Sequence, residues 1–198
     1  MRGNGGRSNP SKSAVPSNGH ARAPLTTDVL VPELRISGNK LAHHFDALRQ
    51  IEVDHFHSVA PHEFRPSRKS LSEGGIPIGS ALARNGTLLA VGHNKRVQNA
   101  DPVTHAEIDC LRNAGRIGTF RDTVLFSTLM PCYLCSGAVV QFGIPKVIVG
   151  ECRTFPGGPE FMRSHGVEVI DLDLPECVEM MRQFIAANLQ LWNEDIGV

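Results

Sequence analysis

The stretch THAEIDCLRNAGR, residues 104–116, most restricts what this chain can fold into, because it places His105 and Glu107 two residues apart where a helix is expected to begin. Two readings of this pair are open. In the first, Thr104 and Glu107 form a capping box, in which each side chain bonds the backbone at the start of the helix. In the second, His105 binds a metal ion, and Glu107 stays off the metal and transfers protons. These residues alone do not decide between the two readings.

A second predicted helix start, in the segment MPCYLC, offers two more metal ligands. Cys132 and Cys135 are three residues apart, so both sulfurs share one face of a helix that has Pro131 in its first turn. The N-terminal end of a helix favours negative charge, which stabilises the thiolates that bind metal. With His105, this set of two thiolates and one imidazole suits zinc and leaves the fourth tetrahedral position open for water, as in catalytic sites.

A structural zinc knuckle is the main alternative for these ligands, and it would require a fourth cysteine or histidine. The nearest candidate, Cys110, lies five residues after His105, so we expect its thiol to point away from the ion. The remaining cysteines, Cys152 and Cys177, are interpreted as core or surface thiols. The sequence therefore predicts one catalytic zinc ion per chain, bound by the histidine and the two cysteines, with the glutamate as proton carrier.

The order of the expected elements indicates an α/β fold. Two apolar stretches joined by Asn85-Gly86, within residues 73–94, predict a β-hairpin. Further strands are expected at 123–129, 146–150 and 167–172, and helices at 102–115, 131–143 and 175–189. Strands that alternate with helices predict a sheet with helices on both faces.

The balance of charge limits the classes of partner. Lys plus Arg number 20 and Asp plus Glu number 20, so the chain lacks the net positive charge that supports nucleic-acid binding. No apolar run approaches the ~18 residues that span a bilayer, and no signal-peptide core follows Met1. An odd number of cysteines, five, also argues against a secreted disulfide scaffold. We therefore expect a cytoplasmic or nuclear protein with no membrane partner and no nucleic-acid partner.

The composition divides the chain into three parts. Residues 1–39 are predicted to be a disordered tail, because their first 24 positions are rich in Gly, Ser, Asn and Pro and carry little apolar surface. Residues 40–66 form an N-terminal extension, in which apolar residues recur near helical spacing over 40–58 and predict an amphipathic helix. Residues 67–198 are predicted to be the zinc-dependent catalytic domain.

From about Ser67 onward, the chain resembles the fungal-type cytosine deaminases of the cytidine deaminase superfamily. The pattern His-x-Glu followed by Pro-Cys-x-x-Cys is the signature of zinc-dependent deaminases. The resemblance is carried by EGGIPIG, GHNKR, HAEIDCLRNAGRI, TLMPCYLCSGAVVQFGIPKVIVGE and LWNEDIG. The last segment is the most specific, because the adenosine deaminases that act on tRNA share the zinc motifs but end in a basic helix.

The resemblance implies a three-layer α/β/α fold with a central mixed sheet of about five strands, and a homodimer. It implies hydrolysis of free cytosine, a small-molecule nucleobase, to uracil and ammonia in pyrimidine salvage. Three alternatives stay open. They are a deaminase of another free base or small heterocycle, a tRNA or nucleoside deaminase, and a zinc module that binds partners without catalysis.

The substrate pocket that the resemblance implies has two polar sides and apolar walls. Asn94 is expected to hold the base carbonyl, assisted by the backbone N–H of Ala106. Asp195 and the backbone carbonyl of Met130 are expected to bind the exocyclic amine. Three apolar side chains are expected to form the walls: Ile78, Phe155 and Trp192. Ala106 and Met130 stand where family members often carry Gly and Ser, but both positions contribute backbone groups.

The chain departs from the family before its catalytic domain. The family packs a long first helix against the sheet and ends it at a Glu-Gly-Gly turn. Here RKSLSEGG resembles the last turns of that helix, but Pro61 and Pro66 are expected to interrupt it, at a cost of about 3 kcal/mol for a proline inside a helix. Either the helix of residues 40–58 replaces the missing part, or the N-terminal third reflects a wrong start or reading frame.

Overall fold

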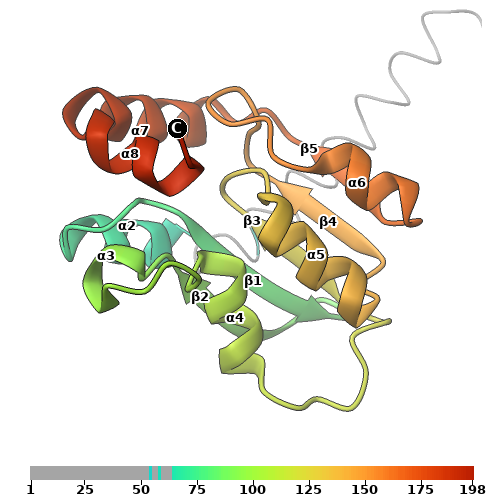
Figure 1. The fold of residues 1–198 in the computed structure, drawn as a ribbon. Helices are drawn as coiled ribbons and strands as arrows, with labels where there is room; N and C mark the ends of the chain where they lie inside the picture. Colours follow the sequence, from blue (N-terminus) through green and yellow to red (C-terminus); the bar gives the residue numbers. More distant parts are fainter. Residues whose placement is uncertain (1–53, 55–57, 59–63) are drawn as a thin grey trace, which may run out of the picture. The chain divides into compact units, whose positions relative to one another are not determined.

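The structure, a computed structural model, describes residues 64–198 together with Asp54 and Ser58 (Figure 1). The predicted tail of residues 1–39 and the helix of residues 40–58, apart from those two positions, lie outside the described residues and stay predictions. The strands are β1 (Gly79–Arg84), β2 (Thr87–His93), β3 (Val124–Ser127), β4 (Lys146–Val149) and β5 (Glu168–Asp171). The helices are α2 (Phe64–Ser72), α3 (Arg96–Asn99), α4 (Ala106–Ala114), α5 (Tyr133–Phe142), α6 (Pro159–Ser164), α7 (Pro175–Ala187) and α8 (Leu189–Ile196).

Strands β1 and β2 form the predicted hairpin. They pair antiparallel, from Gly79 opposite His93 to Arg84 opposite Thr87. The two turn residues, Asn85 and Gly86, have φ values of 50° and 74°. This conformation, which Asn-Gly adopts readily, gives a two-residue turn whose twist matches that of the strands.

The sheet has five strands in the order β2-β1-β3-β4-β5. Strand β1 pairs antiparallel with both of its neighbours, whereas β3, β4 and β5 run parallel to one another. The prediction of a mixed sheet of about five strands is therefore confirmed. Because β3 and β4 are parallel, the segments that follow them start at the same edge of the sheet, which is the usual place for a site in such folds.

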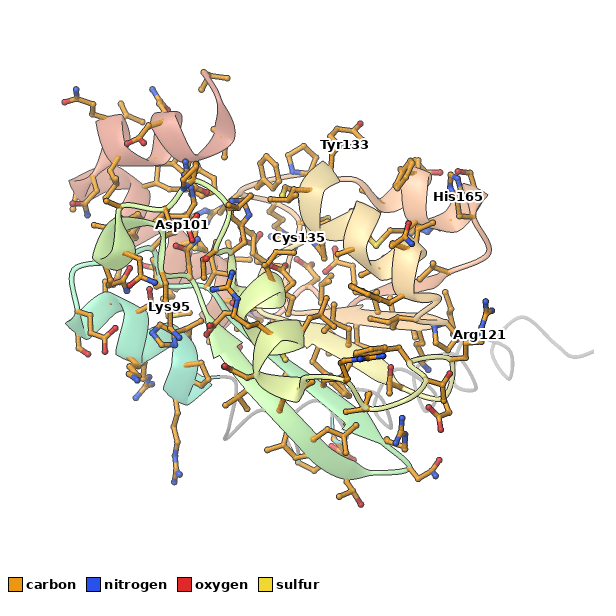
Figure 2. The ribbon with its side chains drawn as sticks, turned by 60° about the horizontal axis from the view of Figure 1, so that its bottom comes forward. Lys95, Asp101, Arg121, Tyr133, Cys135 and His165 are labelled. Atoms are coloured by element: carbon orange, nitrogen blue, oxygen red, sulfur yellow. The ribbon has the colours of Figure 1, made fainter. Side chains whose placement is uncertain are left out.

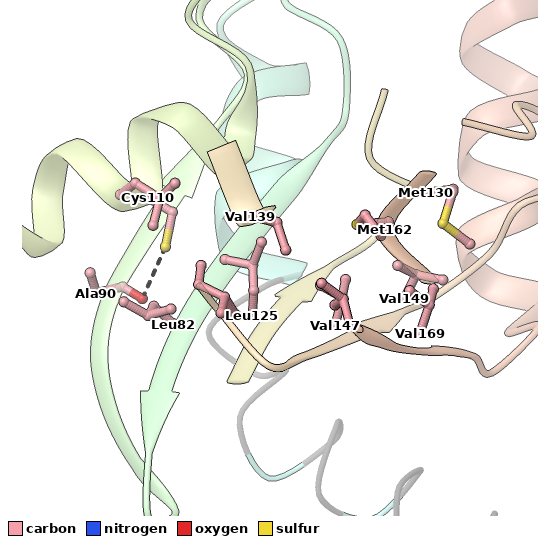
Figure 3. Close-up of a cluster of buried hydrophobic side chains, with 13 residues drawn as sticks. Leu82, Ala90, Cys110, Leu125, Met130, Val139, Val147, Val149, Met162 and Val169 are labelled. Carbon is pink, nitrogen blue, oxygen red and sulfur yellow. Dashed lines mark hydrogen bonds between the residues drawn. The ribbon is translucent and has the colours of Figure 1, made fainter. Parts of the chain in front are cut away.

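Helices α4, α5 and α6 cover one face of the sheet (Figure 3). The buried side chains that meet there come from all five strands and from three helices, and include Leu82, Ala90, Leu125, Val147, Val169, Cys110, Val139 and Met162. The Cys110 thiol lies 3.5 Å from the carbonyl oxygen of Ala90, on this core side of α4. Cys110 therefore belongs to the core, and the prediction that its thiol points away from the metal ligands is confirmed.

Helices α2 and α7 lie on the opposite face. Phe126 and Ile148 point to this face and pack with Cys177 at the start of α7. On the edge strand β2, His93 contacts Glu73 just after α2, and the neighbouring Gly92 points to α4 instead. The sheet therefore has helices on both faces, and the predicted three-layer α/β/α fold is confirmed.

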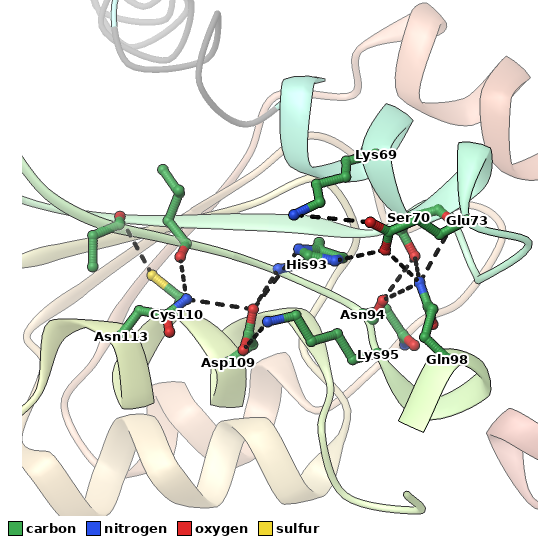
Figure 4. Close-up of polar contacts among 12 residues, drawn as sticks. Lys69, Ser70, Glu73, His93, Asn94, Lys95, Gln98, Asp109, Cys110 and Asn113 are labelled. Carbon is green, nitrogen blue, oxygen red and sulfur yellow. Dashed lines mark hydrogen bonds and ion pairs between the residues drawn. The ribbon is translucent and has the colours of Figure 1, made fainter. Parts of the chain in front are cut away.

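Polar contacts fix the end of α2 against the segment that follows β2 (Figure 4). The Ser70 hydroxyl donates to the carbonyl oxygen of Asn94 at 2.8 Å, and the Gln98 side-chain amide donates to the same oxygen at 3.1 Å. Pro66 is the third residue of α2, where its missing N–H costs no helical hydrogen bond. Pro66 thus lies within a described helix, whereas the expected interruption of a longer helix before it falls outside the described residues and stays a prediction. Pro61 lies outside the described residues.

The helix expected at 102–115 begins four residues later, at Ala106. Asp101 and Pro102 do not open it, because the Asp101 carboxylate accepts a hydrogen bond from the Val103 N–H at 2.8 Å and another from the Thr104 hydroxyl. A carboxylate that bonds the backbone two residues ahead stabilises a turn in place of the helix. Residue 105 is the N-cap as a result.

The end of the chain also differs from the prediction. A single helix over residues 175–189 followed by an irregular tail was expected, but the chain breaks at Asn188 and continues as α8. Trp192 and Asp195 therefore lie on a helix, not after the last one. Among the described helices, none combines the length and the apolar character that a membrane crossing would need.

Gly92→Ala is expected to destabilise the protein, because the added methyl group would lie 2.2 Å from the Cys110 backbone nitrogen and 2.5 Å from the Ala106 oxygen. Both atoms belong to the backbone of α4, which must move as a whole. We expect the free energy of unfolding in urea to fall by roughly 1–3 kcal/mol. Gly137→Ala in α5 is the matched control, since its methyl group would meet no atom within 4 Å. That control should gain roughly 0.5–1 kcal/mol, and equal effects of the two changes would contradict the close packing of β2 on α4.

Candidate active site

The three predicted metal ligands meet where α4 and α5 begin. His105 is the N-cap residue of α4, Cys132 is the N-cap residue of α5, and Cys135 lies in the first turn of α5. Their ligand atoms all lie within 4.8 Å of one another, and His105 Nδ1 is 3.4 Å from Cys132 Sγ. Pro131 was expected in the first helical turn, but it lies just before the N-cap residue. Among the residues that the structure describes, this is the one cluster of three or more such side chains with metal-binding geometry.

The electrostatics of the cluster favour a cation. A hydrogen bond from the Cys135 thiol lowers the pKa of Cys132 to about 4, and the same bond raises the pKa of Cys135. Burial lowers the pKa of His105, but the hydrogen bond with Cys132 and the neighbouring negative charges outweigh burial, so the net shift is upward. A negatively charged Cys132 sulfur would attract a metal cation. Two sulfurs and one imidazole nitrogen at these positions fit zinc and leave one coordination position for a small molecule.

Glu107 is buried beside the cluster, and its contacts exclude the capping box. Its side-chain oxygen Oε1 accepts a hydrogen bond from the Ser127 hydroxyl at 2.9 Å, and the Thr104 hydroxyl bonds Asp101 instead of the helix. Burial raises the pKa of Glu107, and the nearby Cys132 thiolate adds to the effect. A carboxyl group with a raised pKa can both accept and donate a proton near neutral pH. The hydrogen bond from Ser127 anchors the carboxyl group beside the cluster.

A pocket of about 380 Å³ opens above this group. Of the side chains expected to form it, five line the pocket: Ile78, Met130, Phe155, Trp192 and Asp195. The rings of Phe155 and Trp192 meet edge to face, with 6.0 Å between their centroids. Tyr133 points outward at the rim and is 72% exposed, whereas Cys135 lies inside (Figure 2). The pocket is therefore mostly apolar, and its polar lining comes from the acidic and metal-binding groups.

Asn94 and Ala106 do not line the pocket surface, although both were expected to bind substrate. Both are fully buried. The Asn94 backbone N–H donates to the carbonyl oxygen of Ile78 at 3.0 Å, which places Asn94 behind a lining residue. Its side-chain Oδ1 accepts the Arg96 N–H at 3.1 Å, and Nδ2 is buried without a hydrogen-bond partner. A buried amide donor without a partner is uncommon, and a bound carbonyl oxygen would satisfy it.

Sequence reasoning missed two residues that hold this site together, Ser127 and Arg96. Ser127 is the last residue of β3, and a buried strand gives no signal that its hydroxyl faces a carboxylate on another element. Arg96 binds the carboxylate of Asp195, which is 99 positions away in the chain. The one sign of this role in the sequence is that Arg96 lies two residues after Asn94. The end of the chain, which Arg96 contacts, was expected to lie outside any helix.

Residues 54–151 match the family model of the cytidine and deoxycytidylate deaminase zinc-binding region. A cytosine deaminase of Candida albicans is 42% identical over 134 residues, which cover 66% of this chain and 89% of that protein. A tRNA-specific adenosine deaminase of Streptococcus pyogenes is 33% identical over 132 residues, covering 61% of this chain and 83% of that protein.

Solved structures of deaminases share the fold at lower identity. A structure from studies of A-to-I editing by tRNA:A34 deaminases has a TM-score of 0.55 at 23% identity, covering 61% of this chain and 96% of that chain. A guanine deaminase from Nitrosomonas europaea has a TM-score of 0.56 at 19% identity, covering 64% of this chain and 82% of that chain. At these identities the likeness establishes the fold and not the substrate.

Proposed function

The chain belongs to the zinc-dependent cytidine and deoxycytidylate deaminase family, and we propose that it hydrolyses free cytosine to uracil and ammonia. The observation that carries the choice of substrate is the 42% identity to a cytosine deaminase over 89% of its length. The pocket supports the choice, because its flat aromatic walls suit a small planar ring. The product would enter pyrimidine salvage in the cytoplasm.

His105, Cys132 and Cys135 would hold one zinc ion, which when bound lowers the pKa of a water molecule so that a nucleophile is available near neutral pH. Glu107 accepts a proton from this water and delivers it to ring N3 as the oxygen adds to C4. Glu107 then carries the second proton to the exocyclic amine, and the C4–N bond breaks to release ammonia. The balance is one water consumed and one ammonia formed for each cytosine.

The remaining side chains orient the ring. The unpartnered Nδ2 of Asn94 donates to the C2 carbonyl, assisted by the Ala106 N–H, which is among the helix-start amides that have no partner inside α4. Asp195 and the Met130 carbonyl accept hydrogen bonds from the exocyclic amine. Ile78, Phe155 and Trp192 contact the faces and edge of the ring.

A tRNA substrate is the second candidate, because the Streptococcus pyogenes relative bears that name. The charges of the described residues favour the free base. The pocket lining contains Glu107, Glu194 and Asp195 and no lysine or arginine, and α8 carries no basic residue. A polyanion needs clustered basic side chains near the reacting base.

The chain would act as a homodimer. Four apolar side chains are exposed where α4 and α5 begin and where α5 ends: Val103, Tyr133, Leu134 and Phe142. Such side chains together are typical of surfaces that bind another protein. Sedimentation of the zinc-loaded protein should give twice the mass of the chain, and Phe142→Glu should shift it toward the monomer.

Ammonia release from a panel of substrates tests the proposed activity. The zinc-loaded protein should act on cytosine, and should act far more slowly on guanine, adenine, creatinine and a tRNA anticodon stem-loop. A tRNA substrate turned over faster than cytosine would reverse the order of the two candidates. Tight zinc binding without ammonia from any of these substrates would favour a non-catalytic module.

Cys132→Ala should remove zinc from the protein, because two ligands remain where the site needs three. Metal analysis of the purified protein should give about one equivalent for the wild type and almost none for the variant. Cys152→Ala is the matched control, because that thiol lies 2.8 Å from Asp171 and outside the cluster. Full zinc retention by Cys132→Ala would refute this ligand assignment.

A further inference from the structure

The side chain of Arg96, on α3, connects two parts of the chain that meet at the pocket. It is 13% exposed, and its Nε donates to the carbonyl oxygen of Pro102 at 3.1 Å. One terminal nitrogen pairs with the Asp195 carboxylate, and the other lies 3.9 Å from Glu194. Both acids belong to α8, so one arginine bridges the segment before α4 and the last helix of the chain.

The backbone of the same residue controls the orientation of Asn94. Its N–H binds Oδ1 of Asn94 at 3.1 Å, which leaves Nδ2 as the free end of the amide. The amide group is thereby fixed with its donor available for a carbonyl oxygen. Arg96 thus contacts both of the side chains proposed to bind the polar groups of the substrate, Asn94 and Asp195.

Few other polar contacts hold α8 in place. Both of the ion pairs that α8 forms with the rest of the described chain involve Arg96. Its apolar contacts come from Trp192, which is buried and packs edge to face on Phe155, and from the partly buried Leu191 and Ile196. The Asp195 side chain is only 6% exposed, so removing the arginine would leave a buried carboxylate without its partner. Such a group is costly to keep buried, and the outward movement of α8 would relieve the cost.

We propose that Arg96 is a positioning residue for substrate recognition, which holds α8 over the pocket and aims Asp195 at the exocyclic amine of the base. This inference rests on the proposed cytosine deamination for the role of Asp195. The position of α8 can be measured without that activity, because Trp192 lies on α8 and is the only tryptophan in the chain.

Arg96→Gln in the full zinc-loaded chain tests the proposal with two measurements. The first is KM for cytosine, which should rise about 10-fold to 100-fold, as expected for the loss of one partner of a buried charge pair, while kcat changes much less. The second is quenching of Trp192 fluorescence by acrylamide, which should increase because α8 no longer stays closed. If the substitution only destabilised the fold, the melting temperature would fall, but the KM and the Trp192 quenching of the folded protein would stay as in the wild type.

Arg84→Gln is the matched control, because Arg84 likewise binds one carboxylate and one carbonyl, Asp122 at 3.1 Å and Thr119 at 2.6 Å. It should leave KM and Trp192 quenching unchanged. Arg96→Lys keeps the charge but can bridge fewer partners, so both effects should be smaller, and it decides the question by the same measurements if the glutamine variant does not fold. An unchanged KM or unchanged quenching in a folded Arg96 variant would overturn the proposal. A wild type inactive on cytosine would refute the proposed substrate, while the quenching result would still test the contact of Arg96 with α8.

Discussion

Glu107→Gln is expected to abolish deamination while the fold and the zinc content stay as in the wild type. The carboxylate lies beside the metal cluster but is not one of its three ligands, so zinc should remain at about one equivalent. Glutamine keeps the shape of the side chain and can still accept a hydrogen bond from the Ser127 hydroxyl. It cannot take up and release a proton as the carboxyl group does. General acid–base groups contribute on the order of 10²–10⁴-fold to rate, and this one acts in more than one step. We therefore expect kcat to fall by a factor at the upper end of that range.

The measurement is kcat for cytosine at saturation, together with zinc content and the melting temperature of each protein. Glu160→Gln is the control, since that side chain is 85% exposed and pairs with Arg163 on the surface of α6. It should behave as the wild type. More than a tenth of the wild-type rate in Glu107→Gln would remove the glutamate from its assigned role.

The fold could be predicted from local patterns wherever one element supplied its own signal. The pair Asn85-Gly86 predicted the hairpin, and Gly143, with a φ of 68°, ends α5 where expected. The errors fell where a side chain competes with the helix for backbone hydrogen bonds. Asp101 delays the start of α4 in this way, and Asn188 separates α7 from α8. These competing hydrogen bonds are local, between residues at most four positions apart, but they depend on single polar side chains, which hydrophobic periodicity does not describe.

The site could be predicted to the extent that its chemistry needs particular residue types at fixed spacing. Metal ligands have this property, so His105, Cys132 and Cys135 were recognised from the sequence, and the structure brings them together. Residues that orient others have no such spacing. Ser127 and Arg96 act through contacts across 20 and 99 positions of the chain, which only the folded arrangement reveals. The same arrangement explains why Asn94 has an unpartnered donor.

We expect the free base to be preferred over the nucleoside, because in the proposed binding mode a ribose on N1 would meet α8. Helix α8 contributes Trp192, Glu194, Asp195 and Ile196 to the lining, and the Trp192 ring forms with Phe155 an apolar wall that suits a flat ring. A ribose on N1 would have to displace this helix and would leave its hydroxyl groups with few polar partners. We expect kcat/KM for cytosine to exceed that for cytidine by at least about 100-fold, or about 2.7 kcal/mol of transition-state stabilisation.

A chain that ends at Leu191 should lose most activity on cytosine, because it lacks the aromatic wall and the carboxylate that orients the amine. A chain that ends at Gly197 is the control, since it lacks only Val198, which is 81% exposed. Both proteins should keep their zinc, because the three ligands lie on other elements. If α8 alone excludes ribose, the shorter chain should lose both its rate and its preference for cytosine over cytidine. Cytidine turned over by the intact protein as fast as cytosine would mean that α8 does not close the pocket and would make a nucleoside the better candidate substrate.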